Sequence, residues 1–150
     1  MILRTAFKKP SAKHTPKGII FLYEDKDILV VNKASGLLTT GTDKEKNKTA
    51  QVFLSDYVKK GNSRSKNRVY TVHKLDRDIS GVLIFAKSDQ AKKHLMDKWD
   101  GYNKSYYAIV HGRLNPKQGE FSSHLRENKV HRVYSTKNTE KGEQATTAYT

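Results

Sequence analysis

The sequence predicts an α+β domain that is built on a mixed, mainly antiparallel sheet with two main helices. Short apolar runs rich in β-branched residues recur along the chain, as expected of strands. Only two segments, 49–60 and 88–99, place their apolar residues at helical spacing. Strand runs with two interspersed helices are typical of an α+β domain rather than a doubly wound sheet. The 150 residues fit one ordinary domain.

The first elements are two strands joined by a turn. Between Ile19 and Lys33, two apolar runs flank the polar segment 24–27, which predicts a hairpin. Asp25 and Asp27 are spaced like the opening of a calcium loop, but the later ligands and the glycine of such a loop are missing. We therefore assign both residues to the turn.

Two helices and two strands follow. A loop at 34–47 leads into the helix predicted over 49–60. Short apolar runs at 69–72 and 82–86 predict strands on either side of a polar segment. Ser88 is a suitable N-cap for the second helix, whose apolar face carries Ala91, Leu95 and Trp99.

The last third of the sequence predicts a series of strands. They are separated by clusters of Gly, Asn and Lys, and lie at 105–110, 121–126, 130–135 and 145–150. Alternation along the first of them would place Tyr106 and Tyr107 on opposite faces. Since the final segment has strand character up to residue 150, we expect the chain to end within a strand.

Composition points to a polyanionic partner. The chain has 29 Lys and Arg against 15 Asp and Glu, a formal charge of +14 that exceeds what solubility requires in a small domain. Without a long apolar span or a lipidation signal, nucleic acid is favoured over membrane. Cysteine is absent and residues 1–18 lack a secretory signal, so we expect a cytoplasmic protein.

The first eighteen residues differ from the rest of the chain. They carry four lysines and two prolines with little periodicity, which predicts a basic N-terminal arm over 1–18. We assign residues 19–150 to the folded domain. The division depends on where apolar periodicity begins.

Residues 73–81 hold the densest group of side chains that can do chemistry. The segment reads His-Lys-Leu-Asp-Arg-Asp-Ile-Ser-Gly and separates two predicted strands, a position where rigid scaffolds present functional loops. Composition alone leaves open an ordinary charged connection, in which Arg77 and Asp78 are only solvated or paired.

This segment resembles the signature of the RluA-type pseudouridine synthases, which reads His-Arg-Leu-Asp followed by Thr-Ser-Gly or similar and an apolar strand. Further matches fall in the family's order: Ile28 to Leu37 upstream, Lys104 to Gly112 downstream, and Ala145 to Tyr149 near the end. The resemblance covers residues 19–150 and implies a pseudouridine synthase-like catalytic domain.

The resemblance implies isomerisation of specific uridines to pseudouridine in structured RNA, with ribosomal RNA favoured over transfer RNA and without a cofactor. Asp76 would be the catalytic carboxylate, acting as a nucleophile at C1′ or as the base that removes the C2′ proton. Tyr106 would match the active-site tyrosine that packs on the target base. We expect RNA contacts from the remaining site residues, which are His73, Lys74, Arg77 and Lys104.

Three departures from the family pattern stand out. Lys74 replaces the arginine that fills the space of the extruded base, and Lys cannot stack as a plane. Ala34 replaces a proline. The family's later Gly-Arg-x-His-Gln-Ile-Arg motif has no counterpart in residues 1–150, so we expect a fragment of a longer enzyme, incomplete at the C-terminus.

Other functions remain open. A non-catalytic RNA-binding module with the same fold would explain the missing motif, and a basic structural protein of a ribonucleoprotein would explain the charge. A magnesium site at Asp76 and Asp78 lacks a third carboxylate nearby in sequence, and the histidines lack zinc-helix spacing. We therefore expect no metal and no membrane partner.

Overall fold

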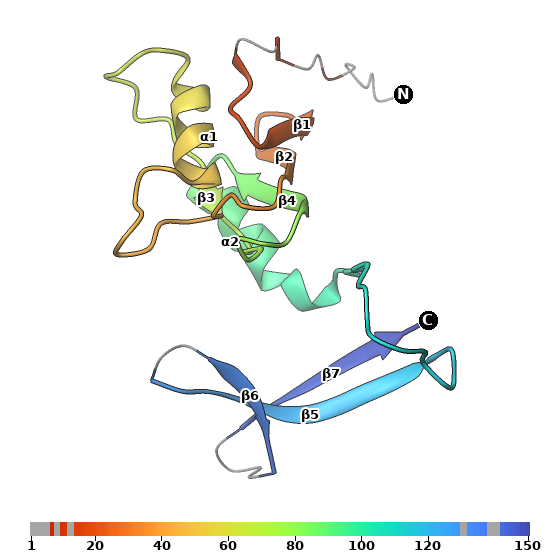
Figure 1. The fold of residues 1–150 in the computed structure, drawn as a ribbon. Helices are drawn as coiled ribbons and strands as arrows, with labels where there is room; N and C mark the ends of the chain where they lie inside the picture. The colour runs from red at the N-terminus through yellow and green to blue at the C-terminus, as the bar shows by residue number, and fades with distance from the viewer. Residues whose placement is uncertain (1–6, 8–9, 12–13, 130–131, 138–141) are drawn as a thin grey trace. The chain divides into compact units, whose positions relative to one another are not determined.

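The computed structural model describes residues 7, 10–11, 14–129, 132–137 and 142–150. The chain forms two compact units, Met1–Lys104 and Ser105–Thr150, which we name the first and second units (Figure 1). Lys8, Lys9 and Lys13, which contribute much of the charge of the predicted arm, lie outside the described residues.

The first unit contains a four-stranded antiparallel sheet. Its strands lie in the order β1 (Ile19–Glu24), β2 (Ile28–Lys33), β4 (Gly81–Ala86) and β3 (Tyr70–Thr71). The predicted hairpin is therefore confirmed, and the strand predicted at 69–72 is a two-residue edge strand. Lys33 at the end of β2 pairs with Gly81 at the start of β4, so the segments that follow and precede them meet at one end of the sheet.

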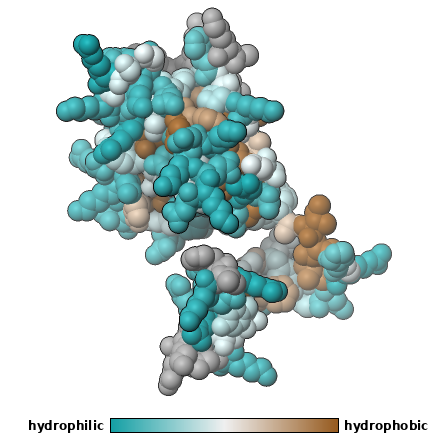
Figure 2. All heavy atoms as spheres, turned by 60° about the vertical axis from the view of Figure 1, so that its left-hand side comes forward, coloured by the Kyte–Doolittle hydropathy of each residue, from teal (hydrophilic) through white to brown (hydrophobic). Residues whose placement is uncertain are grey.

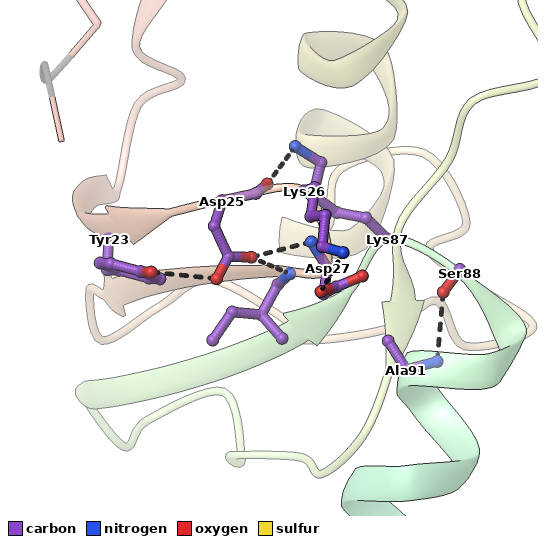
Figure 3. Close-up of polar contacts among 8 residues, drawn as sticks. Tyr23, Asp25, Lys26, Asp27, Lys87, Ser88 and Ala91 are labelled. Atoms are coloured by element: carbon purple, nitrogen blue, oxygen red, sulfur yellow. Dashed lines mark hydrogen bonds and ion pairs between the residues drawn. The ribbon is translucent and has the colours of Figure 1, made fainter. Parts of the chain in front are cut away.

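The turn between β1 and β2 is organised by Asp25, as predicted (Figure 3). One carboxylate oxygen accepts from the backbone N–H groups of Asp27 at 2.8 Å and Ile28 at 2.7 Å, and the other accepts from the Tyr23 hydroxyl at 3.0 Å. The Lys87 ammonium donates to the Asp25 carbonyl at 2.8 Å. These contacts assign the Asp25 side chain to the turn.

Both predicted helices form, each with a hydroxyl cap. Helix α1 (Ala50–Lys59) begins after Thr49, whose Oγ1 accepts from Val52 N, and it ends at Lys60 in the left-handed conformation with φ 51°. Helix α2 (Asp89–Asp97) begins after Ser88, whose Oγ accepts from Ala91 N at 3.1 Å (Figure 3). A short 3₁₀ helix, η2 (Trp99–Gly101), follows α2.

The hydrophobic core lies between α1 and one face of the sheet. Alternate residues of β1, β2 and β4 face α1, and the helix contributes Ala50, Leu54 and Val58. The buried apolar residues of this core are Ile19, Phe21, Leu29, Val31, Ala50, Leu54, Val58, Val69, Leu75, Leu83 and Phe85. Around it the first unit presents a surface dominated by hydrophilic side chains (Figure 2).

The second unit contains a three-stranded antiparallel sheet in the order β6-β5-β7. Its strands are β5 (Gly119–Glu127), β6 (Val133–Thr136) and β7 (Glu143–Tyr149). They confirm the strands predicted at 121–126 and 145–150 and part of the one predicted at 130–135, of which residues 130 and 131 lie outside the described residues.

The strand predicted at 105–110 is wrong. Residues 103–110 have no regular secondary structure, and the large side chains of Tyr107 and Ile109 are fully exposed. A strand requires a hydrogen-bonded neighbour. No ladder among the described residues includes this segment, so its apolar alternation buries nothing.

The fold class is confirmed as α+β with mainly antiparallel pairing and two helices. The only parallel pairing in the described part is an isolated bridge between Leu38 and Thr49. None of the helices formed by the described residues is long and apolar enough to cross a bilayer.

Candidate active site

Asp76 lies in the loop between β3 and β4, which we name the Asp76 loop (residues 73–80). The loop stands at the end of the sheet where β2 ends and β4 begins. The Asp76 residue is exposed, while Leu75 beside it is buried in the core. A turn follows, in which Ile79 N donates to the Asp76 carbonyl at 3.2 Å. The loop thus presents a carboxylate from a well-anchored backbone.

The Asp76 loop is anchored by Lys33, which is 0% exposed. Its ammonium group donates to Asp76 O at 3.1 Å and Arg77 O at 3.3 Å. It also donates to Ala34 O at 3.1 Å and Leu37 O at 2.7 Å in the loop that follows β2. Because the ammonium has three protons for these four carbonyls, at least one proton is shared. Lys33 therefore ties the Asp76 loop to the 34–48 loop.

The electrostatics of Lys33 are governed by its burial. Removal from water lowers the pKa of the Lys33 ammonium, and the attraction of the nearby Asp78 and Asp76 carboxylates opposes this decrease. A buried ammonium is tolerated when carbonyl oxygens satisfy its donors. The arrangement also places a fixed positive charge beneath the Asp76 loop.

Two further contacts connect the same loops. The Thr39 hydroxyl donates to Leu75 O at 2.6 Å and accepts from Leu75 N at 3.1 Å, so one buried side chain satisfies both backbone groups of that residue. Gly36 N donates to Arg77 O at 2.8 Å. Gly36 has φ 87°, a conformation that favours glycine and brings its N–H to this position.

His73 is anchored to the neighbouring strand. Its Nε2 accepts from the backbone N–H of Ile84 at 3.1 Å. An imidazole that accepts at Nε2 and remains neutral carries its proton on Nδ1. Burial, together with the charge of Lys104, lowers the pKa of His73 and favours this neutral form. His73 therefore connects the Asp76 loop to strand β4.

An aromatic cluster covers the other side of His73. The Trp99 ring stacks on the imidazole with centroids 4.5 Å apart and an interplanar angle of 27°. The ammonium of Lys104 lies 5.1 Å from the centroid of the Trp99 ring and donates to Trp99 O at 3.0 Å. Tyr102 meets Trp99 edge-on, with centroids 5.9 Å apart. Lys104, an expected RNA contact, therefore lies close to His73.

The two other basic residues of the loop differ in their surroundings. The Arg77 guanidinium forms an ion pair with Glu45 of the 34–48 loop, with Nη2 and Oε2 2.6 Å apart. Both side chains remain partly exposed, at 49% for Arg77 and 37% for Glu45. Lys74 is exposed and has no hydrogen-bonding partner among the described residues. Arg77 thus connects the two loops, and Lys74 is open to solvent.

Tyr106 belongs to the second unit, in the irregular segment that precedes β5. It is 66% exposed. The other predicted site residues, Asp76, His73, Lys74, Arg77 and Lys104, lie in the first unit.

The acidic side chains of the Asp76 loop are Asp76 and Asp78. Within the described ranges, no three His, Asp or Glu side chains form a group that would hold a metal ion. Asp76 and Asp78 are both exposed.

Sequence reasoning did not identify Lys33, Thr39, Glu45 and Trp99 as site residues. A signal for Lys33 was present, since alternation in β2 places it on the same face as the buried residues Leu29 and Val31. A buried lysine needs partners, so this position could have been recognised as functional or structural. Glu45 had no comparable signal.

One protein family matches most of the chain. The chain matches the family described as RNA pseudouridylate synthase over residues 27–150. The chain belongs to this family. The match includes β2 with Lys33, the Asp76 loop and all three strands of the second unit. The resemblance to RluA-type pseudouridine synthases is thereby confirmed.

Several relatives carry names of this family. Uncharacterized RNA pseudouridine synthase MG209 of Mycoplasma genitalium is 35% identical over 136 residues, which cover 85% of this chain and 41% of the relative. Ribosomal large subunit pseudouridine synthase D of Borreliella burgdorferi is 32% identical over 136 residues, with coverages of 87% and 42%. tRNA pseudouridine synthase C of Yersinia pestis is 36% identical over 93 residues, with coverages of 61% and 34%.

The chain spans about two-fifths of the length of the first two of these pseudouridine synthases. Among solved structures, human RNA Pseudouridylate Synthase Domain Containing 4 matches with a TM-score of 0.64 at 16% identity, covering 85% of this chain and 51% of that protein. Human RNA Pseudouridylate Synthase Domain Containing 1 matches with a TM-score of 0.59 at 18% identity, covering 87% of this chain and 49% of that chain. These likenesses support the fold of a pseudouridine synthase domain.

Proposed function

We propose that the protein isomerises selected uridines of structured RNA to pseudouridine, with Asp76 as the catalytic carboxylate. The observation that carries this proposal is an exposed carboxylate on a loop that the buried Lys33 immobilises through backbone carbonyls. Preorganised functional groups of this kind are typical of active sites. Family membership and a formal charge of +14 add support.

The reaction requires no external reagent. The bond between uracil N1 and C1′ breaks, the base rotates while it remains bound, C5 bonds to C1′, and C5 then loses its proton while N1 gains one. Asp76 acts either as a nucleophile at C1′, forming an ester bond that breaks when C5 bonds to C1′, or as the base that removes the C2′ proton and later returns it. Both routes use an ionised carboxylate. The attraction between the Asp76 carboxylate and the Lys33 ammonium opposes the decrease in the pKa of Lys33 that burial causes.

The other site residues have supporting roles in this proposal. Lys74 is exposed beside Leu75 and Asp76, so it is suited to contact a phosphate of the bound strand. Only one nitrogen of the Arg77 guanidinium pairs with Glu45, and the Arg77 side chain is 49% exposed. His73 and Lys104 support the loop through Trp99. Tyr106 packs on the target base, and its hydroxyl assists the transfer of the C5 proton.

We propose ribosomal RNA as the substrate class. The relative from Borreliella burgdorferi is named for the large ribosomal subunit and covers 87% of this chain. The relative from Yersinia pestis that is named for transfer RNA covers 61%. Uridines in loops suit a chain with Lys74 in place of arginine, since they are already unstacked and need little energy for extrusion.

Tritium release tests both the reaction and the substrate class. The full-length protein is incubated with unmodified ribosomal and transfer RNA transcripts that carry tritium at uridine C5. We expect release from ribosomal RNA, because C5 loses its hydrogen only when the isomerisation is completed. Release from transfer RNA alone would contradict the substrate assignment. Binding of both RNAs with no release would contradict the enzyme and favour a non-catalytic RNA-binding module.

A further inference from the structure

A second basic element lies beside the Asp76 loop. The segment Thr40–Lys48, which we name the lysine loop, leads from β2 towards α1 and projects away from the sheet (Figure 1). Lys44, Lys46 and Lys48 are all exposed. None of the three forms an ion pair with a carboxylate in the described part of the chain. Their charges are therefore available to a partner.

The lysine loop has an internal structure that holds its lysines in place. Thr42 N donates to Glu45 O at 3.0 Å, and Glu45 N donates to the Thr42 hydroxyl at 3.2 Å. At the base of this turn, a Cβ added to Gly41 would lie only 3.2 Å from Lys46 Cα, so the two sides of the loop are in close contact. A turn closed in this way differs from a freely solvated run of charge.

Its position is fixed relative to the Asp76 loop. Glu45 pairs with Arg77, which follows Asp76 directly, at 2.6 Å. Just before the lysine loop, Thr39 forms two hydrogen bonds with Leu75, which precedes Asp76. Just after it, Thr49 caps α1 and is fully buried. The loop is therefore anchored at both ends and connected in its middle to the residue next to Asp76.

We propose that the lysine loop is an RNA-contacting element that binds the phosphate backbone beside the target uridine through Lys44, Lys46 and Lys48, with Glu45 positioning it against Arg77. The inference rests on the proposed function, which supplies RNA as the partner. Exposed lysines without carboxylate partners bind phosphates as point charges. The salt dependence of the RNA-binding constant reports the number of such phosphate contacts. The loop is then a determinant of where the strand lies relative to Asp76.

A salt titration of RNA binding tests this proposal. The probe is a fluorescein-labelled RNA stem-loop with uridines in its loop, and the full-length protein is titrated by fluorescence anisotropy over a range of KCl concentrations. The test variant changes Lys44, Lys46 and Lys48 to Ala. The matched control changes Lys17, Lys93 and Lys117 to Ala, three exposed lysines from other parts of the chain. Both variants lose the same formal charge.

We expect the test variant to reduce the slope of log K against log salt by about 2, since each phosphate contact contributes roughly 0.7 on single strands and 0.9 on duplex. The control should reduce it by less than about 1, because its lysines act only through the general field. Equal reductions in the two variants would overturn the proposal, as they would show that only net charge matters.

Glu45→Ala tests the positioning role of Glu45. It changes the net charge in the direction opposite to that of the lysine substitutions. The change makes the protein more positive, so a carboxylate that merely repelled RNA would give tighter binding when removed. If Glu45 positions the loop, binding weakens several-fold despite the added charge, and circular dichroism shows an unchanged fold. Tighter binding by Glu45→Ala would overturn this part of the proposal.

The same proteins are assayed for tritium release from C5-labelled RNA. Release by the wild-type protein together with equal salt slopes in the two triple variants would reject the lysine loop and leave the pseudouridine synthase intact. A reduced slope in the test variant without release from any protein would keep the RNA contact and reject the isomerisation. The two failures are thus distinguishable.

Discussion

The ammonium of Lys33 donates to the backbone carbonyl of Asp76 at 3.1 Å, across 43 positions of sequence. The contact links the end of β2 to the one carboxylate that the family resemblance assigns to catalysis. A buried donor at this point holds the loop by its backbone and leaves the Asp76 side chain free. Lys33 is therefore a positioning residue in this account, and it acts through Asp76.

Replacing Lys33 by Met tests this role. The substitution removes the ammonium group that donates to the carbonyls of Ala34 and Leu37. We therefore expect the free energy of unfolding to decrease by about 1–3 kcal/mol. The Asp76 loop should also lose its position, lowering kcat more than RNA affinity. Urea denaturation and tritium release measure the two effects. Lys17→Met, at an exposed lysine, should change neither, and a fully active Lys33→Met would contradict the role.

Thr39→Val probes the second anchor with a nearly isosteric change. The hydroxyl that satisfies both backbone groups of Leu75 is removed, and we expect a loss of about 1–3 kcal/mol in the free energy of unfolding. Thr40→Val, next in sequence and less buried, is the control and should change stability by less than about 0.5 kcal/mol. Equal stabilities of the two variants would show that the Thr39 bonds contribute nothing.

Acid should destabilise the first unit through His73. Because burial lowers its pKa in the folded state, the unfolded chain takes up the proton first as pH falls below the ordinary value of 6.5. Stability is therefore full above that pH and declines as pH falls through the window beneath it. Protonation also removes the Nε2 acceptor of the Ile84 N–H group.

Chemical denaturation between about pH 7.5 and about pH 5 measures this decline. His73→Gln keeps an acceptor but cannot titrate, so its stability should fall less over the same range. His94→Gln on α2, where the histidine is exposed, should follow the wild-type curve. Parallel curves for wild type and His73→Gln would exclude His73 as the source of the pH dependence.

Tyr106→Phe tests the proposed role of the phenolic hydroxyl. We expect tritium release to slow by at least about tenfold while RNA binding is retained, since a group that assists proton transfer affects the chemical step. Tyr107→Phe is the matched control, because this fully exposed neighbour has the same hydroxyl. If both variants release tritium at the wild-type rate, the Tyr106 hydroxyl has no part in the reaction.

Local patterns predicted most of the fold. The hairpin followed from two apolar runs around Asp25, and α2 from an N-cap serine before a helical apolar face. These features depend on residues that are close in sequence. The segment 105–110 has an equally strong β pattern but no strand, because pairing depends on a partner that the pattern does not specify.

The candidate site was predictable only in part. The family signature marked Asp76 and its neighbours, but the contacts that hold the loop join residues far apart in sequence. Lys33 reaches Asp76 from 43 positions away, and Glu45 reaches Arg77 from 32. Such pairs are specified by how the loops pack at the end of the sheet. For Lys33 alone, the inward position in β2 offered a signal.

The central claim is that Asp76 performs the chemistry, and the most direct test compares it with Asp78, an exposed carboxylate in the same loop. Asp76→Asn and Asp78→Asn of the full-length protein each lose one negative charge. Single-turnover tritium release is measured at saturating protein, with RNA affinity determined in parallel. The account predicts that Asp76→Asn lowers the rate by at least about a hundredfold with affinity retained, and that Asp78→Asn remains active. Wild-type release by Asp76→Asn would contradict it.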